Sequence, residues 1–511
     1  MPTKPILNPT EAARLVPDGA WLAIQGSGGG AGEPTALLRA IRERFDTAGT
    51  PSGLTLVHAT GLGDKQAIGA DLLAVEGLVE RDIAGHLAMA PQMGRLIQEN
   101  RVASINFPQG VLSHMYHAVA GRKPGVFTKV GLKTYIDPRL EAGKMNDRAK
   151  AEPDRVRVMD IDGEEWLFFP RFHFDAALIR GTTADEHGNI TAEQEAAFLE
   201  AITIAQAAKA CGGKVIAQVK YLAKAGTLDP RNVKIPGVSV DAVVVDPTQR
   251  QTCLREYEPA LCGAVKMPLE RIPPLPLDAR KVVARRAARE LNPNAIVNLG
   301  VGMPDGVASV ATEEGIIDTL TFTVEQGLVG GMPAGGVEFG VAYNPSAIIG
   351  EDDQFNFYDG GNLDIAFLGM AQLDGSGNVN VSKVGNLLAG CGGFINITQN
   401  AKKVVFCGTF TAKGFACTVN DGLLTIQQDG SIRKCVDQVE QITFSGAFAK
   451  ERQQPVLFIT ERAVLELRTD GLWLTEIAPG ADLDKGILGQ MAFEPRIPED
   501  GPALMDPDLF R

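Results

Sequence analysis

The acidic residue Glu325 separates a short β-branched run from a glycine-rich segment in residues 321–336, TFTVEQGLVGGMPAGG. Residues 321–324 predict a buried strand, because β-branched and aromatic side chains suit a covered sheet. The glycines that follow Glu325 let the backbone turn sharply and let a ligand approach the main chain. A carboxylate held among backbone N–H donors at the end of such a strand can attack an activated carbonyl group. We therefore predict that Glu325 is a catalytic nucleophile, with helix capping or ion pairing as the alternative.

A second glycine-rich segment, GCGGF, occupies residues 390–394. Its glycines, Gly390, Gly392 and Gly393, can expose successive amides to one oxygen, as in an oxyanion hole or an anion nest. A tight turn between two elements is the alternative explanation. We do not expect Cys391, inside the segment, to be a nucleophile, because no histidine lies near it in the sequence.

Other polar residues could also take part in a site. Gln109, in PQG after a predicted strand (104–107), can offer its side-chain amide to a substrate carboxylate or to Glu325, with an ordinary loop amide as the alternative. The acidic run at 351–353 is expected to be a solvated turn rather than a metal site. His114 and His117 form HxxH without a third ligand nearby, and the seven cysteines form no CxxC, so no metal site is expected.

Glycine loops follow a predicted strand in each half of the chain. Residues 21–25 predict a strand, GSGGGAGEP follows at 26–34, and residues 35–45 predict a helix. Strand, glycine loop and helix begin a βαβ unit whose loop amides face a ligand. The loop also fits GxGxxA, so a dinucleotide site is an alternative, although the next strand ends in His58 rather than in an acid.

The second half repeats this plan, and part of it repeats the first half residue by residue. Residues 294–299 predict a strand, GVGMPDG follows at 300–306, and 307–312 predict a helix. DAALI and DEHGNI, which begin at 175 and 185, match DIAFL and DGSGNV at an offset of 189 residues, and the match resumes where KVI at 214 aligns with KVV at 403. Two separated matches in one register indicate a duplicated α/β domain.

We therefore predict an α/β fold of two tandem, duplicated open domains with mainly parallel sheets. The proline-rich residues 268–277 suit a linker, which places the domains at 1–275 and 278–511. A length of 511 residues also requires more than one domain. Periodicity is poor between 123 and 166, so irregular structure that covers a site is expected there.

Composition limits the partners and the location. The net charge of −13 and the pI near 5.1 argue against a nucleic-acid or anionic-membrane partner. No apolar run has the length of a signal peptide or of a membrane span, so a cytoplasmic location is expected. An anionic small molecule is still allowed, because loop amides can hold one.

Together these segments resemble the family I coenzyme A transferases. EQGLVGG after a strand is similar to the family's E-x-G segment, and GCGGF is similar to its G-x-G-G-F oxyanion segment. The two glycine loops resemble the paired signatures of the family's halves, and the resemblance continues through PQG, GKMN at 143–146 and FYDGGNLDIAFLG at 357–369. It covers nearly the whole chain. Within the family, the chain resembles the single-chain short-chain acyl-CoA:acetate and propionate CoA-transferases, in which the two halves are fused. It differs from the 3-oxoacid branch, in which the nucleophile lies in S-E-N-G, because this chain has VEQG at 324–327.

The resemblance implies transfer of coenzyme A between a short-chain acyl-CoA and a free carboxylate such as acetate. Glu325 would form an acyl anhydride and then a glutamyl-CoA thioester in a ping-pong scheme, with oxyanions held near Gly392, Gly393 and Val301. Gln109 is the further catalytic candidate. The implied coenzyme contacts are Gly300, Val301, Gly302, Met303, Gly390, Phe394 and Lys413, and the implied contacts of the carboxylate substrate are Gly28, Gly29 and Gly30.

The resemblance also implies that coenzyme A is a substrate, that no cofactor is tightly bound, and that the chain forms a homo-oligomer, a dimer or a tetramer. Three alternatives stay open. An acyl-CoA hydrolase would share every motif, an NAD-dependent dehydrogenase would not need Glu325, and a non-catalytic protein would bind CoA esters without exchange.

Overall fold

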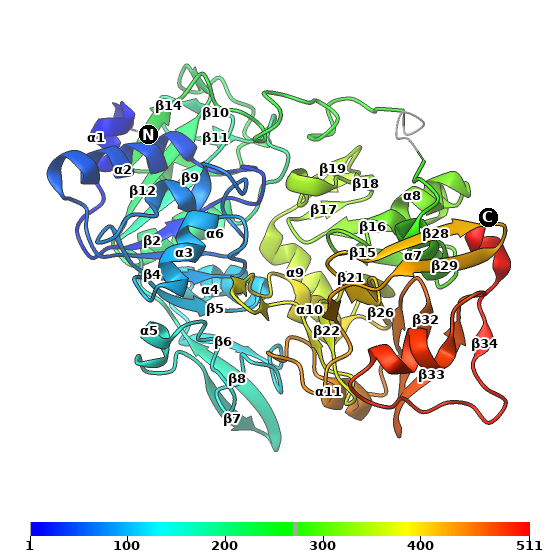
Figure 1. The fold of residues 1–511 in the computed structure, drawn as a ribbon. Helices are drawn as coiled ribbons and strands as arrows, with labels where there is room; N and C mark the ends of the chain where they lie inside the picture. Colours follow the sequence, from blue (N-terminus) through cyan, green and yellow to red (C-terminus); the bar gives the residue numbers. More distant parts are fainter. Residues whose placement is uncertain (1, 269–273) are drawn as a thin grey trace. The chain divides into compact units, whose positions relative to one another are not determined.

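The computed structural model describes residues 2–268 and 274–511, which form two compact units (Figure 1). The first unit comprises the chain up to Met267 together with Val324–Asn356 and Gly385–Gly393, and the second comprises Pro268–Thr323, Phe357–Val384 and Phe394–Arg511. Two segments of the second half therefore belong to the first unit, and both carry predicted site residues. The predicted domains 1–275 and 278–511 stay a prediction, and residues 269–273 of their boundary lie outside the described residues.

The first unit is built on an eight-stranded sheet whose neighbouring strands are all parallel. Its central strands are buried along their whole length, as expected for a parallel sheet covered on both faces. The sheet order is β1 (Ile6–Leu7), β14 (Ala242–Val245), β12 (Lys214–Val219), β9 (Ala176–Arg180), β2 (Trp21–Ile24), β3 (Leu54–His58), β4 (Val79–Ala84) and β5 (Ala103–Asn106).

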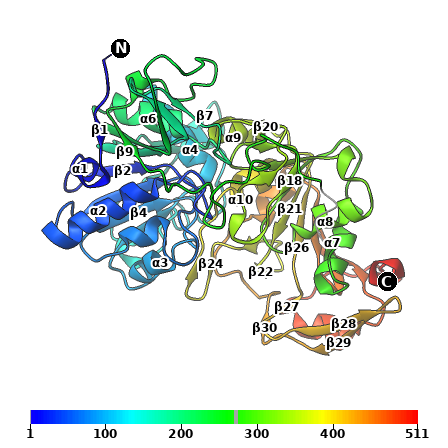
Figure 2. The ribbon, with the colours of Figure 1, turned by 90° about the horizontal axis from the view of Figure 1, so that it is seen from above.

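Six helices of the first unit come from the N-terminal half. Two of them, α4 and α6, pack against each other, and α6 also lies against β9, β12 and β2. Helix α2 packs against α1, and Figure 2 shows both beside the strands of this unit. The helices are α1 (Pro9–Ala13), α2 (Thr35–Ala48), α3 (Pro91–Gln98), α4 (Gln109–Ala120), α5 (Asp147–Lys150) and α6 (Ala201–Ala210).

Shorter strands complete the first unit. A three-stranded sheet has β10 (Thr183–Asp185) between β11 (Ile190–Thr191) and β13 (Tyr221–Ala223). From the second half come the hairpin strands β17 (Leu328–Val329) and β20 (Ala347–Ile348), the pair β18 (Met332–Pro333) and β19 (Ala342–Tyr343), and β25 (Leu387–Leu388). Helix α9 (Glu351–Asp359) begins in the first unit.

The second unit repeats the parallel core and extends it with antiparallel strands. Its sheet runs β16 (Thr321–Val324), β15 (Ile296–Leu299), β21 (Ile365–Gly369), β26 (Val404–Cys407), β31 (Val456–Ile459), β32 (Ala463–Arg468), β33 (Gly471–Ile477) and β34 (Ala503–Leu504). The smaller strands are β22 (Gln372–Leu373), β23 (Val379–Asn380), β24 (Lys383–Val384), β27 (Thr411–Ala412), β28 (Ala416–Asn420), β29 (Leu423–Gln428) and β30 (Ile432–Arg433), and the helices are α7 (Ala279–Ala288), α8 (Gly306–Glu313), α10 (Phe394–Asn400) and α11 (Gly446–Glu451). Figure 2 shows the hairpin of β28 and β29.

The predicted duplication is confirmed strand by strand. The parallel order β14-β12-β9-β2-β3 in the first unit corresponds to β31-β26-β21-β15-β16 in the second. The matched acids before the central strands also make equivalent bonds. Asp175 accepts the N–H of Trp21, at the start of β2, and Asp364 accepts the N–H of Ile296, at the start of β15, each at 2.9 Å. The same order of five strands, and the same contact at the start of β2 and β15, therefore occur in both units. This repetition confirms the predicted fold class.

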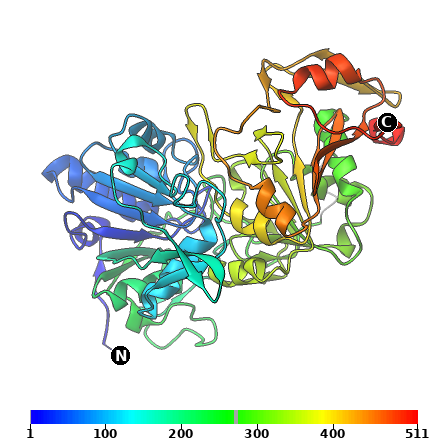
Figure 3. The same cartoon turned by 90° about the horizontal axis from the view of Figure 1, so that it is seen from below.

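One prediction about local structure is wrong in part, and another is wrong. Residues 123–166 were expected to be irregular, and 129–146 do consist mainly of turns and bends. The two ends of the stretch, however, contribute to an antiparallel sheet in which β8 (Glu164–Pro170) lies between β6 (Gly125–Thr128) and β7 (Arg157–Ile161), drawn in cyan in Figure 3. The alternation of apolar and polar residues is weak in this stretch because both faces of β7 are largely exposed. Residues 351–353 were expected to be a solvated turn, but they start α9 with Glu351 fully buried. Packing of this helix against the first unit overrides the preference of acids for solvent.

Among the described residues, no helix combines the length and the apolar composition that crossing a membrane requires.

We predict that the duplicated turn stabilises both units to a similar extent. Asp185 accepts N–H groups of His187 and Asn189 and the side-chain amide of Asn189, and Asp374 makes the equivalent three bonds with Ser376 and Asn378. Asp185→Ala and Asp374→Ala should each lower the free energy of unfolding by about 2 kcal/mol, since bonds to a charged acceptor are lost. Thermal unfolding measures this loss, and Asp500→Ala, at an exposed position, is the control.

The contribution of Asp185 should also depend on pH. Burial acts to raise the pKa of Asp185, but the hydrogen bonds from Asn189 and from neighbouring amides outweigh it, so that the net pKa is lowered. A lowered folded-state pKa means that the stabilisation is present above the ordinary aspartate value and is lost as the pH falls below it. An equal effect of Asp185→Ala at pH 3 and pH 7 would contradict this origin.

Candidate functional site

Glu325 and Gln326 occupy the tip of a tight turn at the carboxyl end of β16. The N–H of Gly327 donates to the carbonyl of Val324 at 3.0 Å and closes the turn. Gly327 has φ +95°, and a Cβ on it would lie 2.2 Å from the carbonyl oxygen of Ile349, so only glycine fits. Glu325 is 8% exposed. The predicted nucleophile is therefore a buried carboxyl on a rigid turn rather than a solvated surface acid.

The segment Gly390–Gly393 is held by the loops after β4 and β5. The amide of Cys391 donates to Asn106 Oδ1 at 2.9 Å, and the amide of Gly392 donates to the carbonyl of Gly85 at 2.7 Å. Gly390 has φ +75°, and a Cβ there would lie 2.5 Å from Asn106 Nδ2. The amide of Gly392 is thus already used in this conformation, so the predicted oxyanion role can be kept for Gly393 but not for the Gly392 N–H.

Gln109, the first residue of α4, connects this segment to α9. Its backbone N–H donates to the carbonyl of Gly392 at 2.9 Å, and its Nε2 donates to Glu351 Oε1 at 3.0 Å. The other carboxamide atom, Oε1, lies 3.6 Å from where a Cβ of Gly392 would be. The predicted residue Gln109 therefore presents a hydrogen-bond acceptor, not its amide donor, towards the glycine segment.

The chain just before α9 reaches the turn that carries Glu325. The N–H of Ile349, two residues before Glu351, donates to the carbonyl of Gly327 at 2.8 Å. The turn, the start of α9, Gln109 and the glycine segment are consequently linked inside the first unit by hydrogen bonds and by the short stretch of chain between Ile349 and Glu351. Three of the segments that sequence reasoning singled out are thereby brought together.

The first glycine loop also lies in this unit, but its amides are mostly occupied. The N–H of Gly29 donates to the carbonyl of Gly63, and the N–H of Gly30 donates to the carbonyl of Ser27. Gly29 and Gly30 are buried, whereas Gly28 is half-buried. A Cβ on Gly29 would lie 2.5 Å from the carbonyl of Val337, so this glycine allows close packing of two loops. Of the three predicted substrate contacts, Gly28 is the one with an accessible surface.

The loop residues predicted for coenzyme binding at 300–303, together with Phe394 and Lys413, belong to the second unit. Gly300–Met303 follow β15, where the N–H of Gly300 donates to the carbonyl of Phe367 at 2.7 Å and Val301 is 54% exposed. The ring of Phe394 stacks on Phe406 with centroids 5.9 Å apart. Lys413 is exposed and has φ +62°. The exposed loop after β15 can therefore meet a ligand, whereas Phe394 is part of the packed core.

Sequence reasoning missed Asn106, His86 and the acid pair of Glu200 with Glu351. Asn106 is fully buried at the end of β5, and its Nδ2 donates to the carbonyls of Ala84 and Gly85 at 2.6 Å. The imidazole of His86 lies beside Gly392, and burial lowers its pKa to about 4, so the ring is neutral at pH 7. An asparagine at the end of a predicted strand was the available signal for Asn106, because an amide that is buried there needs hydrogen-bond partners.

The environment of Cys391 agrees with the prediction that it is not a nucleophile. The side chain is buried, and burial raises the pKa of its thiol to about 12. A thiol with so high a pKa is almost entirely protonated at pH 7, and the thiolate is the reactive form. Cys391 is therefore a small, buried packing residue within the glycine segment.

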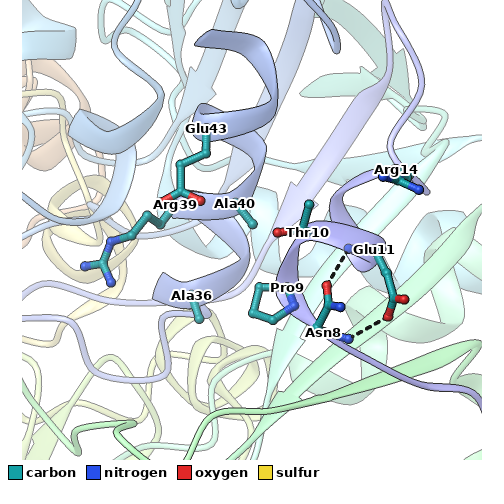
Figure 4. Close-up of a pocket in the computed structure, with 9 residues that line it drawn as sticks. All are labelled: Asn8, Pro9, Thr10, Glu11, Arg14, Ala36, Arg39, Ala40 and Glu43. Atoms are coloured by element: carbon teal, nitrogen blue, oxygen red, sulfur yellow. Dashed lines mark hydrogen bonds between the residues drawn. The ribbon is translucent and has the colours of Figure 1, made fainter. Parts of the chain in front are cut away.

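A surface groove of about 480 Å³ lies between α1 and α2 (Figure 4). Glu11 and Asn8 form a reciprocal cap at its edge, each donating a backbone N–H to the other's side chain. None of its lining residues is among the predicted site residues. They are Asn8, Pro9, Thr10, Glu11, Arg14, Ala36, Arg39, Ala40 and Glu43.

Comparisons with known proteins identify similar chains. The family model for coenzyme A transferase matches residues 6–246. A caffeate CoA-transferase of Acetobacterium woodii is 46% identical, covering 98% of this chain and 96% of its own. The acetate CoA-transferase YdiF of Escherichia coli (strain K12) is 42% identical, covering 99% and 95%.

Solved structures are similar over the same length. The acyl-CoA transferase YdiF of E. coli O157:H7, crystallised as a thioester complex with CoA, has a TM-score of 0.94 and 40% identity, covering 100% of this chain and 96% of that chain. The apoenzyme of the same protein has a TM-score of 0.95 and 41% identity. Both units of the present chain are therefore included in the similarity.

We predict that Cys391 resists alkylation in the native protein. Iodoacetamide at pH 8 should label the half-buried Cys211 while leaving Cys391 unmodified, because a buried thiol of raised pKa offers almost no thiolate. Peptide mass spectrometry after a short exposure measures both sites. Labelling of Cys391 at the same rate as Cys211 would contradict the burial described here, and labelling of both in urea is the control.

Proposed function

This chain belongs to the coenzyme A transferase family and is an enzyme that moves coenzyme A between an acyl-CoA and a carboxylate, and we propose that Glu325 is its nucleophile. The observation that carries the assignment is the position of Glu325, buried on a tight turn at the end of β16 in the same compact unit as the glycine segment 390–393. Burial keeps water from competing for the acyl group, and neighbouring main-chain groups can stabilise developing charge.

The proposed reaction has four steps that balance. A carboxylate oxygen of Glu325 attacks the thioester carbon, the C–S bond breaks, and an acyl-glutamyl anhydride and CoA thiolate result. The thiolate attacks the glutamyl carbonyl and releases the first carboxylate, which leaves a glutamyl-CoA thioester. The incoming carboxylate attacks the carbonyl of that thioester, the C–S bond breaks, and a new acyl-glutamyl anhydride and CoA thiolate result. The thiolate then attacks the new acyl carbonyl, which gives the product acyl-CoA and restores Glu325.

The amide of Gly393 and an amide near Val301 are the proposed donors to the oxyanions of these steps. The N–H of Gly392 is assigned a structural role instead, because it donates to Gly85. Gln109 is proposed to set the position of this segment and to offer its Oε1 to a neighbouring donor. Coenzyme A is proposed to contact the exposed loop at 300–303 and Lys413 in the second unit, and remote binding energy from its nucleotide can orient the thioester.

For the carboxylate substrate we propose a short-chain acid such as acetate or propionate, handled near Gly28. The acetate specificity in the name of the E. coli relative supports this choice. The name of the Acetobacterium relative supports a second candidate, an aromatic acid such as caffeate. The cytoplasmic location and the homo-oligomeric state expected from the sequence stay predictions.

Glu325→Ala should abolish exchange and lower kcat by at least about a thousandfold, because loss of a covalent nucleophile removes the only route through the intermediate. The assay mixes propionyl-CoA with acetate and follows acetyl-CoA by chromatography. Glu314→Ala, an exposed acid of the second unit, is the matched control and should leave the rate unchanged.

The covalent intermediate can be sought directly. Wild-type protein mixed with propionyl-CoA and quenched in acid should carry CoA on the peptide that contains Glu325, and the Glu325→Ala variant should not. Normal turnover in that variant, or an adduct on another peptide, would refute the mechanism. Exchange of CoA between propionyl-CoA and acetate without a change in nicotinamide absorbance would exclude hydride transfer. Binding of CoA esters without this exchange would indicate a non-catalytic protein.

Transfer and hydrolysis are distinguished by the need for an acceptor. Without acetate, propionyl-CoA should release propionate once per active site and then stop, because CoA remains on Glu325 until another carboxylate arrives. A thiol reagent and propionate assays measure the burst and the steady state. Continuous release of free CoA without an acceptor would show that water is admitted and would support a hydrolase.

Comparing acetate, propionate and caffeate as acceptors then ranks the two substrate candidates by kcat/KM.

A further inference from the structure

Two acidic side chains, Glu200 and Glu351, lie against each other in the interior of the first unit. Glu200 precedes α6 and is 2% exposed, and Glu351 begins α9 and is fully buried. Ser113 of α4 lies between them, with its Oγ 2.9 Å from Glu200 Oε1 and 3.1 Å from Glu351 Oε1. The N–H of Glu351 also donates to the carbonyl of Leu199. Three helices therefore meet at one pair of acids.

The contacts of this pair require that it holds a proton. Ser113 has one hydroxyl proton and can donate it to only one of the two acids. Glu351 Oε1 accepts from Gln109, no donor in the described part of the chain reaches Glu351 Oε2, and the carboxyl of Glu200 is a hydrogen-bonding neighbour of the Glu351 side chain. Two carboxylates in such contact repel each other unless a proton lies between them. A neutral Glu351 that donates to the Glu200 carboxylate removes this repulsion.

The electrostatic environment points the same way. Burial raises the pKa of Glu200 to about 7. Burial, and after it the charge of Glu200, raises the pKa of Glu351 well above its ordinary value. The other titratable groups around the pair are Tyr116, His114 and His117 of α4 and Asp352 and Asp353 of α9, of which His117 is paired with Asp352 at 2.5 Å.

The pair acts on the site through Gln109. Because the neutral Glu351 offers Oε1 as an acceptor, the carboxamide of Gln109 is fixed with Nε2 towards α9 and Oε1 towards Gly392. The backbone of Gln109 holds the carbonyl of Gly392, so the orientation of one residue sets both its own acceptor and the glycine segment. A free carboxamide would rotate, and the segment would lose one of its fixed neighbours.

We propose that Glu351, kept neutral by Glu200, is a positioning residue that fixes Gln109 and the segment 390–393 for transfer of coenzyme A. This role rests on the proposed function of Glu325 and adds to it a protonated acid pair that never touches the substrate. It assigns a purpose to two buried acids that the four chemical steps do not use.

The first test is a double-mutant cycle between Glu351 and Gln109. Glu351→Ala should lower kcat at least tenfold with a smaller change in KM, whereas Glu351→Gln should stay within about threefold of wild type at pH 7, because a neutral amide can still accept from Gln109 and donate to Glu200. In a Gln109→Ala background, Glu351→Ala should change kcat less than twofold, since its target is gone. Asp353→Asn, an exposed acid of the same helix, is the control.

The second test is the pH dependence of stability. The folded pair still holds protons at pH values where the acids of the unfolded chain have ionised, because the pKa of Glu200 is raised to about 7 and that of Glu351 is raised further by burial and by the charge of Glu200. Stability should therefore fall as the pH rises above the ordinary glutamate pKa, and it should fall more steeply in wild type than in Glu351→Gln, which lacks one of the two acids. Denaturant unfolding of the two proteins side by side measures this difference.

The outcomes separate this proposal from the proposed function. A CoA adduct on Glu325 in all the Glu351 variants, with the kinetic and pH differences above, supports both. Three results would overturn the positioning role: equal losses of kcat in Glu351→Gln and Glu351→Ala at pH 7, fully additive effects of Glu351→Ala and Gln109→Ala on kcat, or the same pH dependence of stability in wild type and Glu351→Gln. If the CoA adduct on Glu325 still formed, the proposed function would stand. Absence of the adduct in wild type would overturn the function itself.

Discussion

The two hydrogen bonds of Gln109 are the contacts on which the site depends. Its backbone N–H holds the carbonyl of Gly392, and its side chain holds Glu351. Gly392 and Glu351, which lie far from α4 in the sequence, therefore both contact Gln109, the first residue of this helix. From Glu351 the chain leads back to Ile349, whose N–H donates to Gly327 in the turn that carries Glu325.

The division of the chain follows from the same contacts. Residues 324–356 and 385–393 come from the second half, yet they belong to the compact first unit. Asn106 and Gly85 supply the acceptors that hold the amides of the glycine segment, so the loops of the duplicated sheet become the support of the site. The two units thus contain similar sheets, and two segments of the second half, which carry Glu325 and the glycine segment, belong to the first unit.

Several of these features could be predicted from the residues alone. The β-branched run before Glu325, the strand and helix patterns around the glycine loops and the repeat at a fixed offset all depend on local sequence, and the structure confirms them. The acid pair could not be predicted, because Glu200 and Glu351 face each other only after α6 and α9 pack on α4. The acidic run at 351–353 instead indicated solvent, which is the usual place for adjacent charges.

Glycine has two different uses in this molecule, and sequence cannot separate them. Gly29, Gly327 and Gly390 are required because a Cβ would collide with neighbouring atoms, and the amides of Gly29, Gly30 and Gly392 donate to carbonyls within the protein. Only the glycines whose amides stay accessible can serve a ligand. A glycine-rich motif therefore identifies the region of the site, while the hydrogen bonds decide which amide can do chemistry.

The most direct measurement of the central claim is oxygen transfer to Glu325. When the enzyme turns over propionyl-CoA with acetate labelled with ¹⁸O in its carboxylate, each anhydride cycle leaves one acetate oxygen on the nucleophile. Mass spectrometry should find ¹⁸O in the peptide that contains Glu325 and in no other acidic peptide. Active turnover without ¹⁸O on that peptide would contradict the account.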